Sequence, residues 1–320
     1  MKKFYPFIAL LLILVIGLAA CGGNDNNAAN NDNMGNNNDG DDDMGDDAPM
    51  TLLEVVLDRG YLIVSTDPNY EPISYLDPLA ERAADTVCPG ELLTYGEMVG
   101  FDVDVAKAVA DGLGVDICFA TPDWDLITAG SWGDRWDISI GSMTATLTRA
   151  EALSFSTPYV YTPAQFAATT DSGITSWDDL DGQTICLAVA TTYLDWMNGE
   201  LTITEDAIFT DPPSDVTIVE LPTDQECAQS IAAGRPEFSV YLTSAEVINS
   251  NIAGGLDVVK VGGAVFSENL SPATDRSSSY DIDTFVAEIS RIVDGLHADG
   301  TLSALSLQWF DVDMTQDPTK

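Results

Sequence analysis

Basic residues are scarce in this chain. Of its 320 residues, 12 are lysine or arginine and 52 are aspartate or glutamate, which gives a formal net charge of −40. A protein that binds nucleic acid needs a basic patch for the phosphates, and this sequence contains none. We therefore expect no nucleic-acid partner. The acidic residues run through the whole chain, which indicates a surface adapted to high salt, where repulsion between carboxylates is screened.

Histidine is almost absent as well, because His297 is the only one. The sequence shows no CxxC spacing, no phosphate-binding loop and no histidine paired with a nucleophile. We therefore expect no metal, no cofactor and no catalytic residues. His297 falls in a helical pattern and is interpreted as a surface residue.

Cysteines are few, and four of the five lie beyond residue 21. An even number of cysteines in an exported protein is expected to form disulfides. Three pairings are possible. The spacing favours Cys88 with Cys118 and Cys186 with Cys227.

Long apolar runs are missing too, apart from residues 7–18. That run is shorter than the roughly 20 residues that a membrane-spanning helix needs, although such a helix is the alternative. It follows Lys2 and Lys3 and precedes Leu-Ala-Ala-Cys21, which resembles the lipobox of bacterial lipoproteins. We expect residues 1–20 to be a signal peptide and Cys21 to be lipidated. The protein would then be anchored at the outer face of the cytoplasmic membrane.

The segment 21–49 is almost entirely asparagine, aspartate and glycine. Such a composition cannot bury enough apolar surface to offset the entropy lost on ordering, so we expect a disordered tether. The remaining residues, 50–320, are long enough for two domains of medium size.

Short apolar runs alternate with helical patterns along this part, which predicts an α/β fold with mostly parallel sheets. The expected strands are 61–66, 116–120, 137–140, 184–189, 217–220 and 238–242. The expected helices are 102–113, ending at Gly112 and Gly114, and 282–297 and 302–310.

The pattern breaks twice, at 155–165 and at 262–279. If the final helices return to the first domain, the chain crosses between two lobes at these breaks and leaves a hinge of two strands. We expect lobe 1 to comprise 50–161 and 267–320, and lobe 2 to comprise 162–266.

Ligands of an open parallel sheet bind beyond the carboxyl ends of its strands. That rule selects a set of candidates that follow the expected strands. They are Asp67, Tyr70, Trp124, Gly141, Ser142, Thr144, Arg149, Thr191 and Thr192.

Arg149 is the most informative candidate. It stands in the first turn of an expected helix, where Thr148 and Glu151 have the spacing of a capping box. A cation is unfavourable at a helix N-terminus unless an anion lies opposite, and a ligand carboxylate would meet the guanidinium in bidentate fashion, helped by the Ser142 and Thr144 hydroxyls. The alternative is a salt bridge with Glu151 or another surface acid.

Thr191 and Thr192 open a second expected helix, so two helix ends would clamp one carboxylate. Taken alone, a pair of threonines is more often an ordinary N-cap. Trp124 and Tyr70 would form aromatic walls, unless they are core residues.

Six stretches resemble the bacterial extracellular solute-binding proteins, in the branch that binds polar amino acids. Their order and spacing agree across nearly the whole of 50–320. The stretches are TDPNYEPIS (66–74), GFDVDVAKAVA (100–110), DWDLI (123–127), GSMTATLTRA (141–150), LSFSTPY (153–159) and ADGTL (298–302).

The resemblance implies a monomer with two lobes that close on an amino acid or related small carboxylate and deliver it to an ABC permease. Arg149 would hold the α-carboxylate, while Trp124 and Tyr70 would stack on the rest of the solute. A dehydratase-like enzyme on the same fold, and a receptor that reports to a sensor protein, are the alternatives.

The sequence departs from the family at two positions. Leu242 or Thr243 stands where the family usually has an acid for the ligand's ammonium, so Thr243 becomes a candidate contact and the ammonium would rely on Asp67 or Glu71. Ala190 replaces the usual glycine before the threonine pair.

Overall fold

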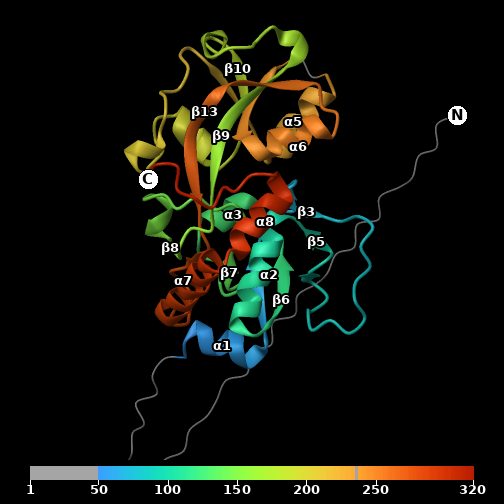
Figure 1. Cartoon of the computed structure of the whole chain (residues 1–320), viewed down its shortest axis with the longest axis vertical. Coiled ribbons are helices and arrows are strands. Elements are labelled where there is room, and N and C mark those ends of the chain that lie inside the picture. Colours follow the sequence, from blue (N-terminus) through green and yellow to red (C-terminus); the bar gives the residue numbers. More distant parts are fainter. Residues whose placement is uncertain (1–49, 235–236) are drawn as a thin grey trace, which may run out of the picture. The chain divides into compact units, whose positions relative to one another are not determined.

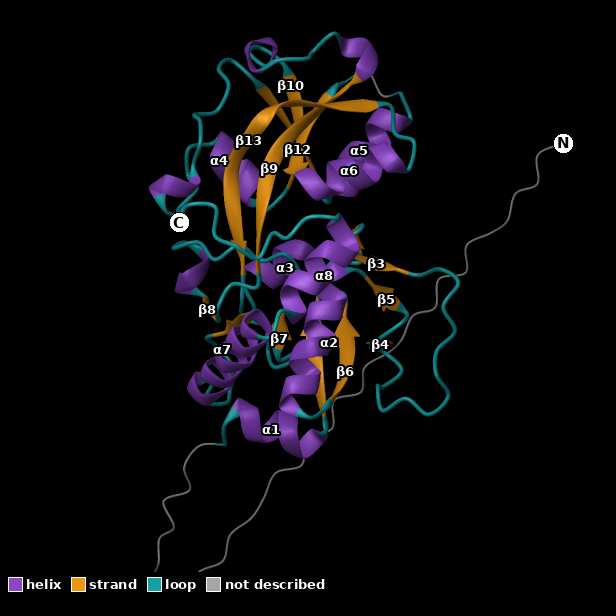
Figure 2. Ribbon diagram, viewed as in Figure 1, coloured by secondary structure: helices purple, strands orange, loops and turns teal. Residues whose placement is uncertain are grey.

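The structure is a computed structural model that describes residues 50–234 and 237–320. The expected signal peptide (1–20), the lipidation site Cys21 and the tether (21–49) lie outside the described residues. Within the described part, the chain builds two large sheets with helices packed around them, as Figures 1 and 2 show. The predicted α/β class is confirmed.

The first sheet has the strand order β4-β6-β1-β7-β14-β8. Its centre is parallel, because β1 pairs in parallel with β6 and β7, whereas β4, β14 and β8 pair antiparallel. The sheet is therefore mixed rather than mostly parallel. Its strands are β1 (Tyr61–Ser65), β4 (Leu93–Thr94), β6 (Asp116–Ala120), β7 (Ile138–Ser139), β8 (Leu153–Phe155) and β14 (Ala273–Asp275).

Five helices accompany this sheet, and a small sheet of three short strands lies beside it. The helices are α1 (Leu52–Arg59), α2 (Phe101–Leu113), α3 (Trp124–Thr128), α7 (Asp283–Ala298) and α8 (Thr301–Phe310). The short strands are β2 (Asn69–Tyr70), β3 (Ser74–Leu76) and β5 (Met98–Val99). Helices α7 and α8 pack on α2 and share its apolar core, so the end of the chain returns to the first sheet as expected.

Helix α2 does not stop at Gly112. It runs through that residue, which packs closely against α7: a Cβ at Gly112 would lie 2.6 Å from the Ile292 side chain, so a larger residue would require Ile292 to shift. The helix ends at Leu113, before Gly114 with φ +75°, a left-handed conformation that suits a glycine C-cap.

The second sheet has the order β11-β10-β12-β9-β13. Strand β10 pairs in parallel with β11 and β12, while β9 and β13 pair antiparallel. The strands are β9 (Val160–Thr169), β10 (Thr184–Ala188), β11 (Thr217–Leu221), β12 (Val240–Ser244) and β13 (Val258–Leu270). Three helices cover it: α4 (Thr192–Met197), α5 (Asp224–Ala232) and α6 (Ala245–Ala253). Single 3-10 turns occupy Arg149–Glu151, Thr170–Ser172, Trp177–Asp179 and Glu205–Ala207.

Strands β9 and β13 form the two connections between the sheets. They pair antiparallel from Thr169 opposite Val258 to Val160 opposite Leu270, with a register shift between Val261 and Phe266. The expected break at 262–279 is therefore wrong over its first part, because β13 continues to Leu270 and only its glycine-containing bulge interrupts the ladder.

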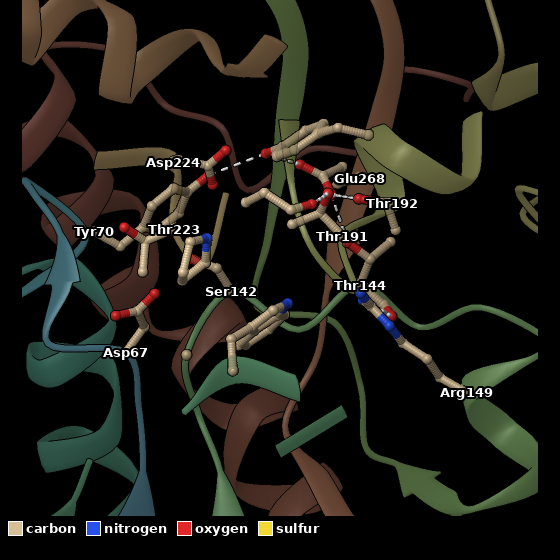
Figure 3. Close-up of a pocket in the computed structure, with 15 residues that line it drawn as sticks. Asp67, Tyr70, Ser142, Thr144, Arg149, Thr191, Thr192, Thr223, Asp224 and Glu268 are labelled. Atoms are coloured by element: carbon tan, nitrogen blue, oxygen red, sulfur yellow. Dashed lines mark hydrogen bonds between the residues drawn. The ribbon is translucent and has the colours of Figure 1, made fainter. Parts of the chain in front are cut away.

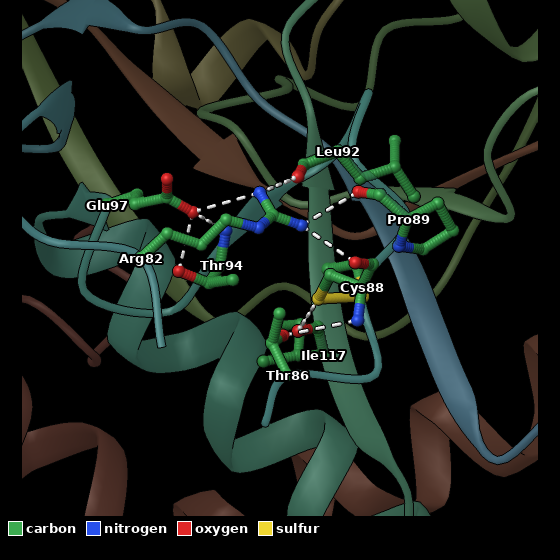
Figure 4. Close-up of polar contacts among 9 residues, drawn as sticks. Arg82, Thr86, Cys88, Pro89, Leu92, Thr94, Glu97 and Ile117 are labelled. Atoms are coloured by element: carbon green, nitrogen blue, oxygen red, sulfur yellow. Dashed lines mark hydrogen bonds and ion pairs between the residues drawn. A yellow bond between two sulfur atoms is a disulfide. The ribbon is translucent and has the colours of Figure 1, made fainter. Parts of the chain in front are cut away.

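Each sheet carries one disulfide. Cys88 is bonded to Cys118 of β6, and Cys186 of β10 is bonded to Cys227 of α5, which is the pairing that the spacing favours. Near the first bridge, Arg82 donates to the backbone carbonyls of Cys88, Pro89 and Leu92 and pairs with Glu97, as Figure 4 shows. The Arg82 guanidinium and the Cys88–Cys118 disulfide thus hold the long loop before β4 against the first sheet.

Two smaller points concern the rest of the described chain. No helix in residues 50–234 and 237–320 has the length and apolar character to cross a membrane. His297 is half-buried, and its Nε2 lies 2.8 Å from the carbonyl oxygen of Pro158, so it is a structural contact rather than a plain surface residue.

Candidate functional site

A small pocket, about 40 Å³ in volume, lies where strand ends of both sheets meet, and Figure 3 shows the side chains that line it. Nine of the ten predicted contacts line this pocket: Asp67, Tyr70, Trp124, Gly141, Ser142, Thr144, Arg149, Thr191 and Thr192. Six further residues complete the lining: Ala188, Tyr193, Pro222, Thr223, Asp224 and Glu268. The strand-end rule therefore located the pocket but found only part of its wall.

The first sheet brings its candidates together through short connections. Asp67 follows β1, Gly141 and Ser142 follow β7, and Trp124 begins α3. Strand β7 runs parallel to β1, so both strands end at the same edge. At Gly141 a Cβ would lie 2.9 Å from Thr66 Oγ1, so glycine is needed for this close approach.

Arg149 is buried, with 8% of its surface exposed. Its Nη1 donates to the Thr144 carbonyl at 3.1 Å and its Nη2 donates to the Ala190 carbonyl at 3.0 Å. The guanidinium carbon also lies 5.6 Å from the centre of the Trp124 ring, a cation–π distance. Within the described residues, no carboxylate oxygen lies within 4.0 Å of the guanidinium, so the alternative of a surface salt bridge with Glu151 is not realised.

The helical setting predicted for Arg149 is wrong. Residues Arg149–Glu151 form a single 3-10 turn, and Thr148 makes no capping hydrogen bond. The Arg149 backbone N–H is instead bonded to Thr146 Oγ1 at 3.1 Å. Helix α4 does begin at the predicted threonine pair, with Thr191 as its N-cap, but it spans six residues. The clamp of two helix ends is therefore not present.

The hydroxyl groups predicted to share a ligand carboxylate are all engaged inside the protein. Ser142 donates to Asp102 at 2.8 Å, and Thr191 donates to the Ala188 carbonyl at 2.7 Å. Burial raises the pKa of this Asp102 carboxyl to about 7, although the hydrogen bonds from Ser142 and Tyr159 oppose the shift. Of the predicted partners for an anion, Arg149 thus remains the strongest.

Glu268 is the first residue that the sequence analysis missed. Its side chain is 4% exposed and comes from β13. Its Oε1 accepts hydrogen bonds from Thr144 at 2.7 Å and Thr192 at 2.5 Å, and its Oε2 accepts one from Tyr193 at 2.8 Å. The Glu268 carboxylate therefore accepts the hydrogen bonds of the Thr144 and Thr192 hydroxyls, which were predicted to bind the ligand.

Asp224 is the second missed residue, and it begins helix α5. It is 8% exposed, and its Oδ1 has no hydrogen-bond partner among the described residues. Burial raises the pKa of the Asp224 carboxyl well above its usual range, and the charges of Asp67 and Glu268 raise it further. An acid at the start of a helix was a visible signal, but nothing in the sequence placed it at the pocket.

Hydrogen bonds fix the polar atoms of the aromatic residues in the wall. The hydroxyls of Tyr70 and Tyr193 lie 3.0 Å apart, and Trp124 Nε1 donates to the Ala190 carbonyl at 3.1 Å. Burial raises the pKa of the Tyr70 phenol above its usual range. Tyr193 was not a predicted contact.

Two predicted acceptors lie outside the pocket wall. Thr243 is fully buried behind Tyr70, with its hydroxyl 3.4 Å from the phenol oxygen, so it does not line the pocket. Glu71 is exposed and lines a different surface depression. Asp67 does line the pocket, and burial raises the pKa of its carboxyl.

Ala190 adopts φ +57°, the left-handed region in which a side chain is disfavoured. The strain is tolerated where surrounding contacts fix the backbone. Here the Ala190 carbonyl accepts from both Arg149 and Trp124, so this peptide is held in place. Among the described residues no group of three or more His, Cys, Asp or Glu side chains has the arrangement of a metal site.

The chain is similar in sequence to a family of known proteins. Residues 83–312 match the family model of the bacterial extracellular solute-binding proteins, family 3. The L-cystine-binding protein TcyJ of Escherichia coli is 25% identical over 269 residues, which cover 83% of this chain and 88% of TcyJ.

Solved structures show the same fold. The arginine-binding protein of T. maritima, as its P235GK mutant, aligns with a TM-score of 0.64 and 22% identity over 82% of this chain and 100% of that one. The ancestral amino acid-binding protein AncCDT-1, a precursor of cyclohexadienyl dehydratase, aligns with a TM-score of 0.63 and 25% identity over 81% of this chain and 99% of that one.

Proposed function

The chain belongs to family 3 of the bacterial extracellular solute-binding proteins, and we propose that it captures an amino acid outside the cytoplasm and delivers it to an ABC permease. The observation that carries this proposal is Arg149, a buried guanidinium that lines the pocket without a carboxylate partner within 4.0 Å among the described residues.

A buried charge is costly unless an opposite charge compensates it. Burial lowers the pKa of Arg149, which reflects this cost, although the charges of Glu268 and Asp195 act in the opposite direction. A ligand carboxylate supplies the missing partner, because the planar guanidinium can donate two parallel hydrogen bonds to its oxygens. We assign Arg149 to the α-carboxylate on this ground.

The other predicted contacts would enclose the ligand. Trp124 and Tyr70 would pack against its aliphatic part, and the close approach at Gly141 would shape the floor. We include in the site Asp67, Ser142, Thr144, Thr191 and Thr192, whose side chains line the same pocket.

We further propose lobe boundaries at 50–161 plus 267–320 and at 162–266. Strands β9 and β13 cross between the two sheets near these limits. Capture would proceed by opening and closing about this pair of strands, a hinge motion common to proteins that bind ligands between lobes. The hydrogen bond from Trp124 of α3 to the Ala190 carbonyl joins the two lobes and would break on opening.

The setting of the protein follows from its first 49 residues and its charge. The signal-like run before Cys21 supports a lipid anchor at the outer face of the membrane, with the Asn/Asp/Gly segment as the tether. We propose that the anchored protein is a monomer. The excess of acidic residues supports a saline habitat.

Calorimetric titration of the soluble domain with single amino acids tests the function. Arg149→Ala is expected to weaken binding by about 2 to 5 kcal/mol, the range for breaking a buried charged pair. Arg291→Ala is the matched control, because Arg291 is exposed on α7, pairs with Glu288 and does not line the pocket. Binding that is equally tight in wild type and Arg149→Ala would refute the carboxylate assignment.

The same sample separates a binding protein from an enzyme. After a long incubation with the bound amino acid, chromatography is expected to recover that compound unchanged. Conversion of the ligand would instead indicate an enzyme on this fold.

A further inference from the structure

We propose that the pocket selects an amino acid with a net positive charge, and that Glu268 and Asp224 accept its two cationic groups. This inference rests on the proposed function, because it takes Arg149 as the partner of the ligand's carboxylate. It adds two specificity-determining residues, and it names basic amino acids as the class of ligand.

The charges that line the pocket are unbalanced. Three carboxylates, those of Asp67, Asp224 and Glu268, face a single guanidinium. A zwitterionic amino acid leaves this excess of negative charge unchanged, and an acidic amino acid increases it. An amino acid with a cationic side chain reduces it. Because Arg149, Asp224 and Glu268 are buried, this difference has a larger effect than it would at an exposed surface.

Glu268 has the properties of a fixed anion. Three hydroxyls donate to its carboxylate, and no cationic group among the described residues lies within 4.0 Å of it. The hydroxyls of Thr144 and Thr192 therefore orient a negative charge toward the pocket instead of binding one from the ligand. Glu268 thus supplies the acid that is missing at Thr243, and it does so from strand β13 instead of β12.

Asp224 provides the second acceptor. Its buried Oδ1 lacks a hydrogen-bond partner among the described residues. Such an unpaired polar atom is unfavourable unless a ligand donates a hydrogen bond to it. An acid at the first position of helix α5 would interact equally well with the helix dipole if its side chain were exposed. Burial against the pocket is therefore the feature that the dipole does not explain.

The order of these groups suits a basic amino acid. In Figure 3, Arg149 lies on the right, Asp67 and Asp224 lie on the left, and Glu268 lies between them. A carboxylate at Arg149 would place the α-ammonium near Glu268. The side chain would then extend toward Asp224, where its cationic end would also meet Asp67.

Matched ligands test the inference on the wild-type protein. L-Arginine and L-citrulline have nearly the same shape and differ in the charge of the side chain, and L-lysine and L-norleucine form a similar pair. We expect the charged member of each pair to bind at least about 30-fold more tightly than the neutral member, as for a desolvated charge pair. Agmatine, which is arginine without its carboxylate, tests the role of Arg149 separately.

Two substitutions separate the roles of the acids. Asp224→Asn is expected to reduce the preference for arginine over citrulline to a few-fold, whereas Glu268→Gln is expected to weaken both ligands to a similar extent. Glu226→Gln is the control, because Glu226 lies exposed in the first turn of the same helix and does not line the pocket. It should leave the ratio unchanged.

The outcomes distinguish this inference from the proposed function. If citrulline binds wild type as tightly as arginine while Arg149→Ala abolishes both, the charge selection is wrong and the amino-acid site stands. If agmatine binds as tightly as arginine and Arg149→Ala has no effect, the carboxylate assignment fails and the inference fails with it. The wild-type ratios decide the question even if a variant does not fold.

Discussion

The hydroxyl of Thr144 donates a 2.7 Å hydrogen bond to the carboxylate of Glu268, which lies 124 residues further along the chain. Thr144 follows β7 of the first sheet, and Glu268 lies on one of the two connecting strands. The same carboxylate accepts from Thr192 and Tyr193 of α4 on the second sheet. Glu268 is therefore a junction between both sheets and the hinge.

Removing one hydroxyl from this junction is expected to destabilise the protein. Thr144→Val keeps the shape of the side chain but leaves the buried Glu268 carboxylate with one donor fewer, which should cost about 1 to 3 kcal/mol of unfolding free energy. Thr144→Ser retains the hydroxyl and should cost less. Urea unfolding measures the effect. If Thr144→Val is as destabilising in a Glu268→Gln background as in wild type, the two residues are not coupled.

Sequence patterns predicted the elements better than the site. Short apolar runs between helical patterns predicted β1, β6 and β10, because the buried strands of a parallel core carry continuous apolar residues. Strand β13 was missed, because the Gly262-Gly263 bulge and the polar residues of its second half read as a loop. Glu268 lies on this strand, so it was not predicted as a pocket residue.

The function of individual groups was harder to predict, because it depends on contacts between distant segments. The sequence placed Thr144 and Thr192 at the pocket, but it did not show that an internal carboxylate occupies their hydroxyls. Similarly, Arg149 was correctly expected at the pocket for a partly wrong reason, since its helix is a single 3-10 turn. Its burial, which only the fold reveals, is the stronger argument.

The two disulfides are predicted to stay within their own sheets in solution. Bridges that close 30 and 41 residues leave the two connecting strands free to bend. Removing Cys186 and Cys227 together should cost about 2 to 4 kcal/mol of stability. Mass spectrometry of a non-reducing digest provides the check, and a peptide that joins the cysteines of one sheet to those of the other would contradict the prediction.

Stability should increase with salt, because the negative charges of residues 50–320 repel one another in the folded state. These residues hold 44 of the 52 acidic and 10 of the 12 basic residues, a formal net charge of −34. The screening length falls from about 10 Å at 0.1 M to about 3 Å at 1 M ionic strength. We expect the urea midpoint of the soluble domain to rise between low and molar potassium chloride. An unchanged midpoint would remove the support for a saline habitat.

Glu246 is predicted to make stability fall as the pH rises. Burial raises the pKa of this carboxyl from 4.5 to about 7, while Lys260 acts in the opposite direction and Glu268 adds to the shift. The folded state therefore holds a proton more tightly than the unfolded state. Its contribution is complete below pH 4.5 and is lost as the pH rises through about 7. A pKa difference of this size corresponds to roughly 3 kcal/mol.

Glu246→Gln isolates this contribution, because the amide does not titrate. Wild type should lose stability relative to Glu246→Gln between pH 5 and 8, as urea unfolding at several pH values would show. Asp102 has a pKa of about 7 as well, but it is present in both proteins and cancels in the comparison. Two parallel stability curves would mean that Glu246 does not retain its proton on folding.

Binding of a cationic amino acid should release protons through Asp224. Burial first, and then the charges of Asp67 and Glu268, raise the pKa of this carboxyl in the free pocket, while a hydrogen bond from Thr243 opposes the shift. The phenols of Tyr70 and Tyr193 also face it and stay protonated, since their own pKa values are raised by burial. A bound cation favours the ionised carboxylate and lowers its pKa.

The sign of the pH effect follows from this difference. Because the complex binds fewer protons than the free protein, affinity for L-arginine should fall as the pH falls below the free-state pKa of Asp224 and should level off above it. Calorimetric titrations in two buffers of different ionisation enthalpy count the protons released. Asp224→Asn should reduce the number of protons released. Asp67→Asn should reduce it by a smaller amount, and Glu226→Gln should not change it. Proton uptake on binding would mean that the cation does not meet Asp224, and the basic-ligand assignment would then lose its second acceptor.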